Sequence, residues 1–61
     1  MISKQEAINI ALKQMPEPEF KVVNIVLKDD VFYIGLEKGK YKFEVDVDAI
    51  TGKVIGGGGG A

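Results

Sequence analysis

The first apolar residues of the chain recur at helical spacing. They fall on one face of a helix over roughly residues 4–15, and polar side chains occupy the opposite face. The apolar positions are Ala7, Ile8, Ala11, Leu12 and Met15, with Ile10 on the flank. Ser3 and Glu6 have the spacing of a capping box, in which each side chain binds the backbone N–H of the other residue. Pro16 ends the helix, because the residue before a proline is pushed out of the α region.

After an extended connector over Pro16–Glu19, the pattern changes to strands rich in Val, Ile, Phe and Tyr. Three strands are predicted over Lys21–Lys28, Val31–Lys38 and Lys40–Asp48, separated by turns at Asp29-Asp30 and Lys38-Gly39. In the next turn, the Asp48 side chain caps the backbone and Gly52 supplies a positive φ. A short fourth strand over Lys53–Ile55 then lies beside the third.

The two predicted hairpins place the large apolar residues on one face of the sheet. A two-residue loop at Asp29-Asp30 pairs Leu27 with Phe32, Ile25 with Ile34 and Val23 with Leu36. A two-residue loop at Lys38-Gly39 pairs Leu36 with Tyr41, Ile34 with Phe43 and Phe32 with Val45. A three-residue loop with Gly39 in the left-handed conformation is the alternative at the second turn. A one-residue shift would move the apolar set of a strand to the other face, so the agreement of both turns supports the strand assignment.

The chain is therefore expected to adopt an α+β fold, with one N-terminal helix packed on a four-stranded antiparallel meander sheet of order 1-2-3-4. The helix face of Ile8, Leu12 and Met15 is expected to cover the sheet. The expected sheet core comprises Val23, Ile25, Leu27, Phe32, Ile34, Leu36, Phe43 and Val45. Residues 1–55 form this domain, and residues 56–61 are expected to be a flexible glycine-rich tail or linker.

The composition removes several classes of function. The 61 residues suffice for one domain, and the eight basic residues, all lysines, nearly balance nine acidic ones. Without Cys or His, the chain lacks the commonest metal ligands and the commonest general base. Without Arg or a basic patch, nucleic acid is not an expected partner. No apolar run is long enough to span a membrane, and the N-terminus lacks the apolar region of a signal peptide.

Few hydroxyl groups are available for nucleophilic chemistry. Besides two tyrosines, the chain has only Ser3 and Thr51, which are explained by a helix cap and a turn. We therefore expect no catalytic residue and no cofactor.

Acidic residues on the outer face of the third strand are the one candidate for a metal site. Glu44, Asp46 and Asp48 alternate along this strand, and Asp46 lies beside Val31 in the predicted register. Such hard oxygen ligands suit a weak Ca²⁺ site. Nearby lysines dilute the charge and nothing resembles an EF-hand loop, so a solvated charged face is the preferred interpretation and no metal site is predicted.

The outer face of the predicted sheet, away from the helix, carries more apolar side chains than a fully solvated face should. The candidate patch consists of Val22, Val26, Val31 and Tyr33, with Val26 directly opposite Tyr33 and Gly35 beside Asn24. These are either a few ordinary exposed residues or a contact patch for a partner protein or a second copy of the chain. The first and fourth strands are also edges open to strand addition, and Lys21 and Lys28 partly protect the first.

Both ends of the folded region resemble one protein family. Ser3-Lys4-Gln5-Glu6-Ala7, with Ile8, Ala11 and Leu12, is similar to the S-x-x-E-A-x-x-I/A-A-L opening of PepSY domains. The stretch 41–55, with Asp48-Ala49 and Thr51-Gly52 at the matching places, resembles that family's Y-x-V-x-V-D-A-x-T-G-x-V ending. The sequence departs from the family pattern at Tyr33-Ile34-Gly35, where Tyr-x-Val is more common.

The resemblance implies a helix on an antiparallel sheet, in agreement with the hydrophobic pattern. PepSY domains occur in propeptides of thermolysin-type metalloproteases and in other envelope or secreted bacterial proteins, where they have been proposed to restrain peptidases or to act as interaction modules. The resemblance thus implies a non-catalytic protein-binding module that modulates a peptidase outside the cytoplasm. The alternative is a structural domain that self-associates through its sheet or forms one unit of a longer envelope protein. The expected partner is accordingly another protein or a second copy.

Overall fold

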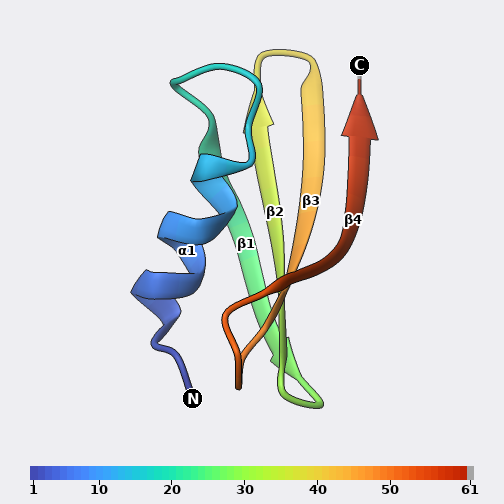
Figure 1. The fold of residues 1–61 in the computed structure, drawn as a ribbon. Helices are drawn as coiled ribbons and strands as arrows, with labels where there is room; N and C mark the ends of the chain where they lie inside the picture. The colour runs from blue at the N-terminus through green and yellow to red at the C-terminus, as the bar shows by residue number, and fades with distance from the viewer. Residues whose placement is uncertain (61) are drawn as a thin grey trace.

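One helix and four strands follow one another along the chain in the computed structural model, which describes residues 1–60 (Figure 1). The elements are α1 (Lys4–Lys13), β1 (Lys21–Lys28), β2 (Val31–Lys38), β3 (Tyr41–Asp48) and β4 (Val54–Gly60). The strands form one antiparallel sheet of order β1-β2-β3-β4, and α1 packs on it chiefly over β2 and β3. The predicted α+β fold is confirmed. The N-terminus and the end of β4 lie at opposite ends of the molecule (Figure 1).

The predicted capping box begins α1. The backbone N–H of Ser3 donates to Glu6 Oε1, and the backbone N–H of Glu6 donates to Ser3 Oγ, both at 3.0 Å. The helix ends at Lys13 with Gln14 as its C-cap, so it stops two residues before the predicted end. Pro16 cannot continue the helix, and the last turn closes with the Met15 N–H donating to the Leu12 carbonyl at 3.2 Å.

The first hairpin has the predicted turn and most of the predicted register. Asp29 and Asp30 both have positive φ, at 50° and 60°, which suits the right-handed twist of a tight hairpin. The predicted pairs of Leu27 with Phe32 and of Ile25 with Ile34 are present. Beyond Asn24, however, a β-bulge shifts the register by one residue, so that Val22 and not Val23 lies opposite Leu36.

The second hairpin corrects the predicted register by two residues. The turn consists of Gly39 and Lys40, one residue later than predicted, because Gly39 takes the positive φ of 59° at the first central position. The observed partners are Leu36 with Phe43, Ile34 with Val45 and Phe32 with Val47, in place of Tyr41, Phe43 and Val45 respectively. A shift of two residues leaves every side chain on its predicted face.

The turn between β3 and β4 follows the prediction. Asp48 Oδ1 accepts hydrogen bonds from the backbone N–H groups of Ile50 at 2.7 Å and Thr51 at 3.1 Å, and Gly52 has a φ of 77°. The turn is tied to two other segments, because the Ile2 N–H donates to the Ala49 carbonyl and the Ala49 N–H donates to the Asp30 carbonyl. These bonds gather the N-terminus and two turns at one end of the sheet.

The fourth strand is longer than the predicted Lys53–Ile55. It runs to Gly60, and the glycines at 56–60 lie opposite residues 46–42 of β3. The structure therefore pairs the glycines that were expected to form a tail, while their flexibility in solution stays a prediction. Ala61, the last residue of that tail, lies outside the described residues.

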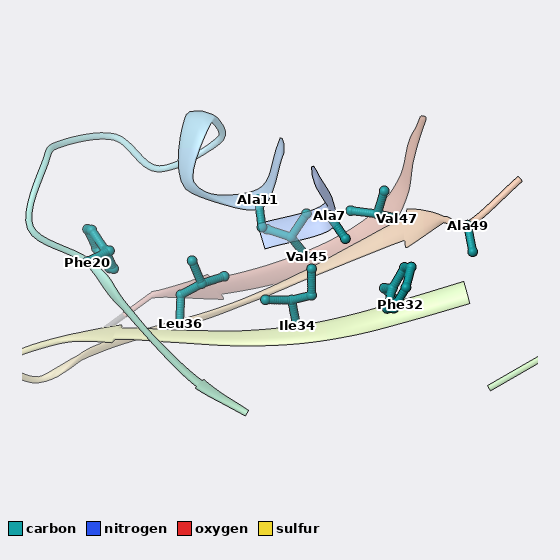
Figure 2. Packing of buried hydrophobic residues seen from close by; sticks show 9 residues of the cluster. All are labelled: Ala7, Ala11, Phe20, Phe32, Ile34, Leu36, Val45, Val47 and Ala49. Carbon is teal, nitrogen blue, oxygen red and sulfur yellow. The ribbon is translucent and has the colours of Figure 1, made fainter. Parts of the chain in front are cut away.

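The core lies between α1 and the inner face of β2 and β3. Its buried residues are Ala7, Ala11, Phe20, Phe32, Ile34, Leu36, Val45, Val47 and Ala49. Figure 2 shows Ala7 and Ala11 of α1 directed toward the sheet. This corrects part of the predicted helix face, because Leu12 is 38% exposed while both alanines are fully buried. Met15 packs against the core as predicted.

Two small side chains let α1 lie close over β2 and β3, and the larger side chains are displaced to its flanks. The predicted strand core changes accordingly. Val23 and Leu27 on β1 are exposed, and Ile25 and Phe43 are only partly buried. The edge strand β1 thus contributes less to the core than the alternation of its residues predicts.

Candidate protein-contact site

The outer face of the sheet presents exposed apolar side chains where the sequence predicts them. Val26 and Tyr33 lie directly opposite each other on β1 and β2, and they are 50% and 37% exposed. Ile34, the chain neighbour of Tyr33, is fully buried in the core, so the alternation of β2 directs Tyr33 to the outer face. Val31, half-buried, continues the same face of β2.

The bulge in β1 exchanges one member of the predicted patch. Val22 lies opposite Leu36 and packs against the core, so its predicted outward position is wrong. The extra residue Val23 instead reaches the outer face, where its Cγ2 atom lies 3.6 Å from the position of a Cβ atom added to Gly35. We use the term outer-face patch for Val23, Val26, Val31 and Tyr33.

A shallow hollow adjoins this patch. The residues that line it include Gly35 and Gly58, which have no side chains, and Val23, Asn24 and Glu44. Asn24 lies opposite Gly35, as predicted, and its side chain occupies the space above that glycine. The arrangement offers a partner an apolar rim with polar groups beside it.

The acidic residues of β3 lie on the same outer face. Glu44 has a raised pKa, first because its protonated carboxyl can donate a hydrogen bond to the Asp46 carboxylate and then because the Asp46 charge opposes its ionisation. Asp46 Oδ1 is buried and has no hydrogen-bond partner. Asp46 lies opposite Tyr33 in the structure, which corrects the predicted position beside Val31.

These carboxylates do not converge on a metal position. Asp48 Oδ1 is occupied by backbone N–H groups of the following turn. Among residues 1–60, no three acidic side chains are close enough to hold a metal ion. The acidic face therefore consists of the Glu44–Asp46 pair and a separate turn-capping residue.

The two hydroxyl groups considered for catalysis have the predicted structural roles. Ser3 caps α1, and Thr51 Oγ1 accepts a hydrogen bond from the Lys53 N–H at 3.2 Å. A hydroxyl oxygen that accepts a hydrogen bond from a nearby backbone N–H in this way stabilises a helix cap or a turn.

A second, more apolar hollow was not predicted from the sequence. It lies where the connector before β1 meets β3 and the end of β4, has a volume of about 290 Å³, and is lined by Pro16, Glu17, Phe20, Tyr41, Phe43 and Gly60. The Phe20 and Phe43 rings meet edge to face with centroids 5.4 Å apart. Phe20 lies between a proline-rich connector and the first residue of a strand, outside any helical or strand repeat of apolar residues. The hydrophobic pattern of the sequence therefore did not predict its burial.

None of the helices within residues 1–60 has the length and apolar content needed to cross a membrane. Residues 1–57 match the model of the PepSY family, which is described as "Peptidase propeptide and YPEB domain". No curated protein and no solved structure matches the chain.

Proposed function

The chain belongs to the PepSY family, and from this we propose that it is a non-catalytic protein-binding module that modulates a peptidase. The family match carries the proposal, since it covers residues 1–57 and its description names peptidase propeptides. A propeptide-like module acts by contact with its partner and needs no reactive group of its own.

The outer-face patch is the contact surface that we assign to this function. Val26 and Tyr33 form a directly opposed, exposed pair on β1 and β2, and a shallow hollow lined in part by Val23 and Asn24 lies beside them. Exposed aromatic side chains are enriched among the anchors of protein interfaces. The partner is a secreted or envelope peptidase, which places the module outside the cytoplasm.

Inhibition and direct binding measured against a panel of secreted metallopeptidases test the proposal. The parent chain is compared with a Val26→Ser/Tyr33→Ala variant, which removes the centre of the patch. Binding by the parent that falls at least about tenfold in the variant supports the proposal. Absence of binding by the parent, or equal binding by both proteins, contradicts it.

The residue after Val26, Leu27, provides a matched control. Leu27 is exposed to nearly the same extent as Val26, at 49% against 50%, but it lies on the opposite face of β1. Leu27→Ser should leave binding unchanged. A loss of binding with Leu27→Ser would show that the variants act through the stability of the hairpin.

A second candidate function is self-association through the sheet. One observation favours it: Lys40 in the preceding turn and Lys42 in β3 alternate with the carboxylates that follow them, in an order that complements the same segment in the antiparallel direction. Dimerisation in sedimentation experiments would support this function, and a strict monomer at high concentration would remove it.

A further inference from the structure

The edge of β3 is covered by a weak strand. All residues of β4 are exposed, and five of the seven are glycines, which lose the most conformational freedom on ordering. Gly57 and Gly59 have φ values of 130° and 155°, which L-residues rarely adopt. The backbone pairing therefore favours glycine at positions 57 and 59, and Gly56–Gly60 add no side-chain packing.

The glycines leave one inner-face residue of β3 only partly covered. Gly57 lies opposite Val45, which the core already buries, whereas Gly59 lies opposite Phe43, which is only partly buried. The apolar hollow of about 290 Å³ opens beside Phe43. A strand with ordinary side chains in this place would bury apolar surface that β4 leaves exposed.

The acidic side chains on the outer face of β3 have no cation opposite them on β2. The single ion pair within residues 1–60 joins Lys38 Nζ to Glu17 Oε1 at 2.9 Å, so Lys42 and Glu44 have none. Glu44 and Asp46 repel each other, and Asp46 Oδ1 has no hydrogen-bond partner. On β2, Glu37 lies directly opposite Lys42, whereas Gly35 and Tyr33 lie opposite Glu44 and Asp46. A neighbouring strand on the other side of β3 can therefore supply the cations that the two acids lack.

The sequence of β3 itself has this pattern. When two copies pair antiparallel about Phe43, Lys42 of each lies opposite Glu44 of the other. Lys40, in the turn before β3, then faces Asp46 of the second copy. Apolar residues meet on the inner face, with Phe43 opposite Phe43 and Tyr41 opposite Val45.

Only one register gives this match. Opposed residues of an antiparallel pair share a face, so allowed registers differ by steps of two residues. Sliding one copy by two residues in one direction places Lys42 opposite Lys42 of the other copy. Sliding it by two residues in the other direction places Glu44 opposite Glu44. Both alternatives set like charges directly opposite, which is unfavourable.

We propose that β3 of a second copy displaces Gly56–Gly60 and joins two molecules into a two-fold symmetric dimer. Three strands from each copy then form one continuous sheet, with both helices on the same face. Val54 keeps its place opposite Val47, because the new strand covers only residues 41–45 of β3 and their immediate flank. This inference specifies the interface of the second candidate function and does not depend on peptidase binding.

Sedimentation equilibrium of the full chain over a wide concentration range tests the dimer. Lys42→Glu and Glu44→Lys each create two like-charge contacts across the two-fold axis, so each should raise the dimer dissociation constant about tenfold or more. The double variant Lys42→Glu/Glu44→Lys restores both contacts with reversed sign and should dimerise like the parent. Lys21→Glu, on the far edge strand β1, is the matched control and should have no effect.

A chain ending at Ile55 tests the displacement. It lacks the competing glycines, so it should dimerise more strongly than the parent, provided circular dichroism shows that it is folded. A parent chain that dimerises without sensitivity to the charge variants would overturn the proposed interface but leave self-association standing. Monomeric behaviour of both the parent and the shortened chain would overturn both.

Discussion

The rings of Phe20 and Phe43 meet edge to face, with an angle of 77° between their planes. Phe20 precedes β1 and Phe43 lies in β3, so this contact joins the connector to a strand two positions across the sheet. It is the one aromatic pair among residues 1–60, and it lines the apolar hollow.

Phe20→Leu should destabilise the domain by about 0.5–1.5 kcal/mol through loss of the aromatic pair, in addition to any effect of altered packing. The measurement is urea unfolding of the parent, Phe20→Leu, Phe43→Leu and the double variant. A double-mutant cycle with no coupling energy would show that the two rings pack independently.

Substitutions of Ala11 and Leu12 should affect the stability of the domain in a different order from the one that residue size alone suggests. Ala11→Leu should cost about 1–3 kcal/mol, because the alanine is fully buried and a larger side chain forces α1 away from the sheet. Leu12→Ala should cost less than the about 2–5 kcal/mol usual for a buried leucine, because Leu12 is partly exposed. Chemical denaturation measures both. A tolerated Ala11→Leu together with a severe Leu12→Ala would favour the helix face predicted from the sequence.

The bulge in β1 predicts different responses from adjacent valines. Val22→Thr should destabilise the domain by about 1 kcal/mol, because it places a hydroxyl against the core. Val23→Thr should stay within about 0.5 kcal/mol of the parent, because Val23 is exposed on the outer face. Thermal unfolding of the two variants, which differ by one position, measures the difference. Equal effects would contradict the bulge.

The Glu44–Asp46 pair predicts a pH dependence with a definite sign. The folded-state pKa of Glu44 is raised above 4.5, so the folded protein binds this proton more tightly than the unfolded chain. Stability should therefore fall as the pH rises from about 4.5 through the raised pKa of Glu44, and the repulsion is fully present at neutral pH.

Glu44→Gln removes this titration. The variant should unfold at a higher temperature than the parent at pH 7, and the difference should shrink toward pH 4. Circular dichroism melts across this range measure both proteins, with Glu37→Gln as a control on the same face of the sheet. A Glu44→Gln variant that is less stable than the parent at pH 7 would show that the ionised carboxylate is favourable in the folded state.

Gly57 and Gly58 of β4 should respond differently to substitution by alanine. Gly57→Ala should weaken the pairing of β4 with β3, because its φ is unfavourable for alanine and the new Cβ atom would meet the Glu44 carbonyl group. Gly58→Ala should leave the pairing intact, because nothing lies within 4 Å of its Cβ position. Amide hydrogen exchange of β3 measures the pairing. Rapid exchange along this edge already in the parent would support the flexible tail predicted from the sequence.

The alternation of apolar residues predicted the faces of the strands but not all of their partners. Ile34 and Tyr33 take the predicted faces, since a period of two settles orientation. The partner of Ile34 is Val45 and not Phe43, because registers two residues apart bury the same faces. Only the position of Gly39 within its turn separates those registers.

The candidate site was predicted where the hairpin is regular. Val26 and Tyr33 lie between the turn and the bulge, so counting from Asp29-Asp30 places them correctly. Val22 and Val23 lie beyond the bulge, and two identical neighbouring side chains give no pattern that shows which one points inward. The burial of Ala11 in place of Leu12 was likewise hidden, because hydrophobic patterns favour large residues whereas close helix–sheet packing favours small ones.

The separation of the chain ends sets how this domain would respond to tension. The molecule is 31 Å long, and the N-terminus is fastened by the Ile2–Ala49 hydrogen bond at the end opposite to that where β4 finishes (Figure 1). A pull between the two ends runs along the strands, so it loads the β3–β4 hydrogen bonds together in shear and does not peel them apart singly. Gly56–Gly60 have no side chains that could interlock against such sliding, so we expect β4 to yield first under load.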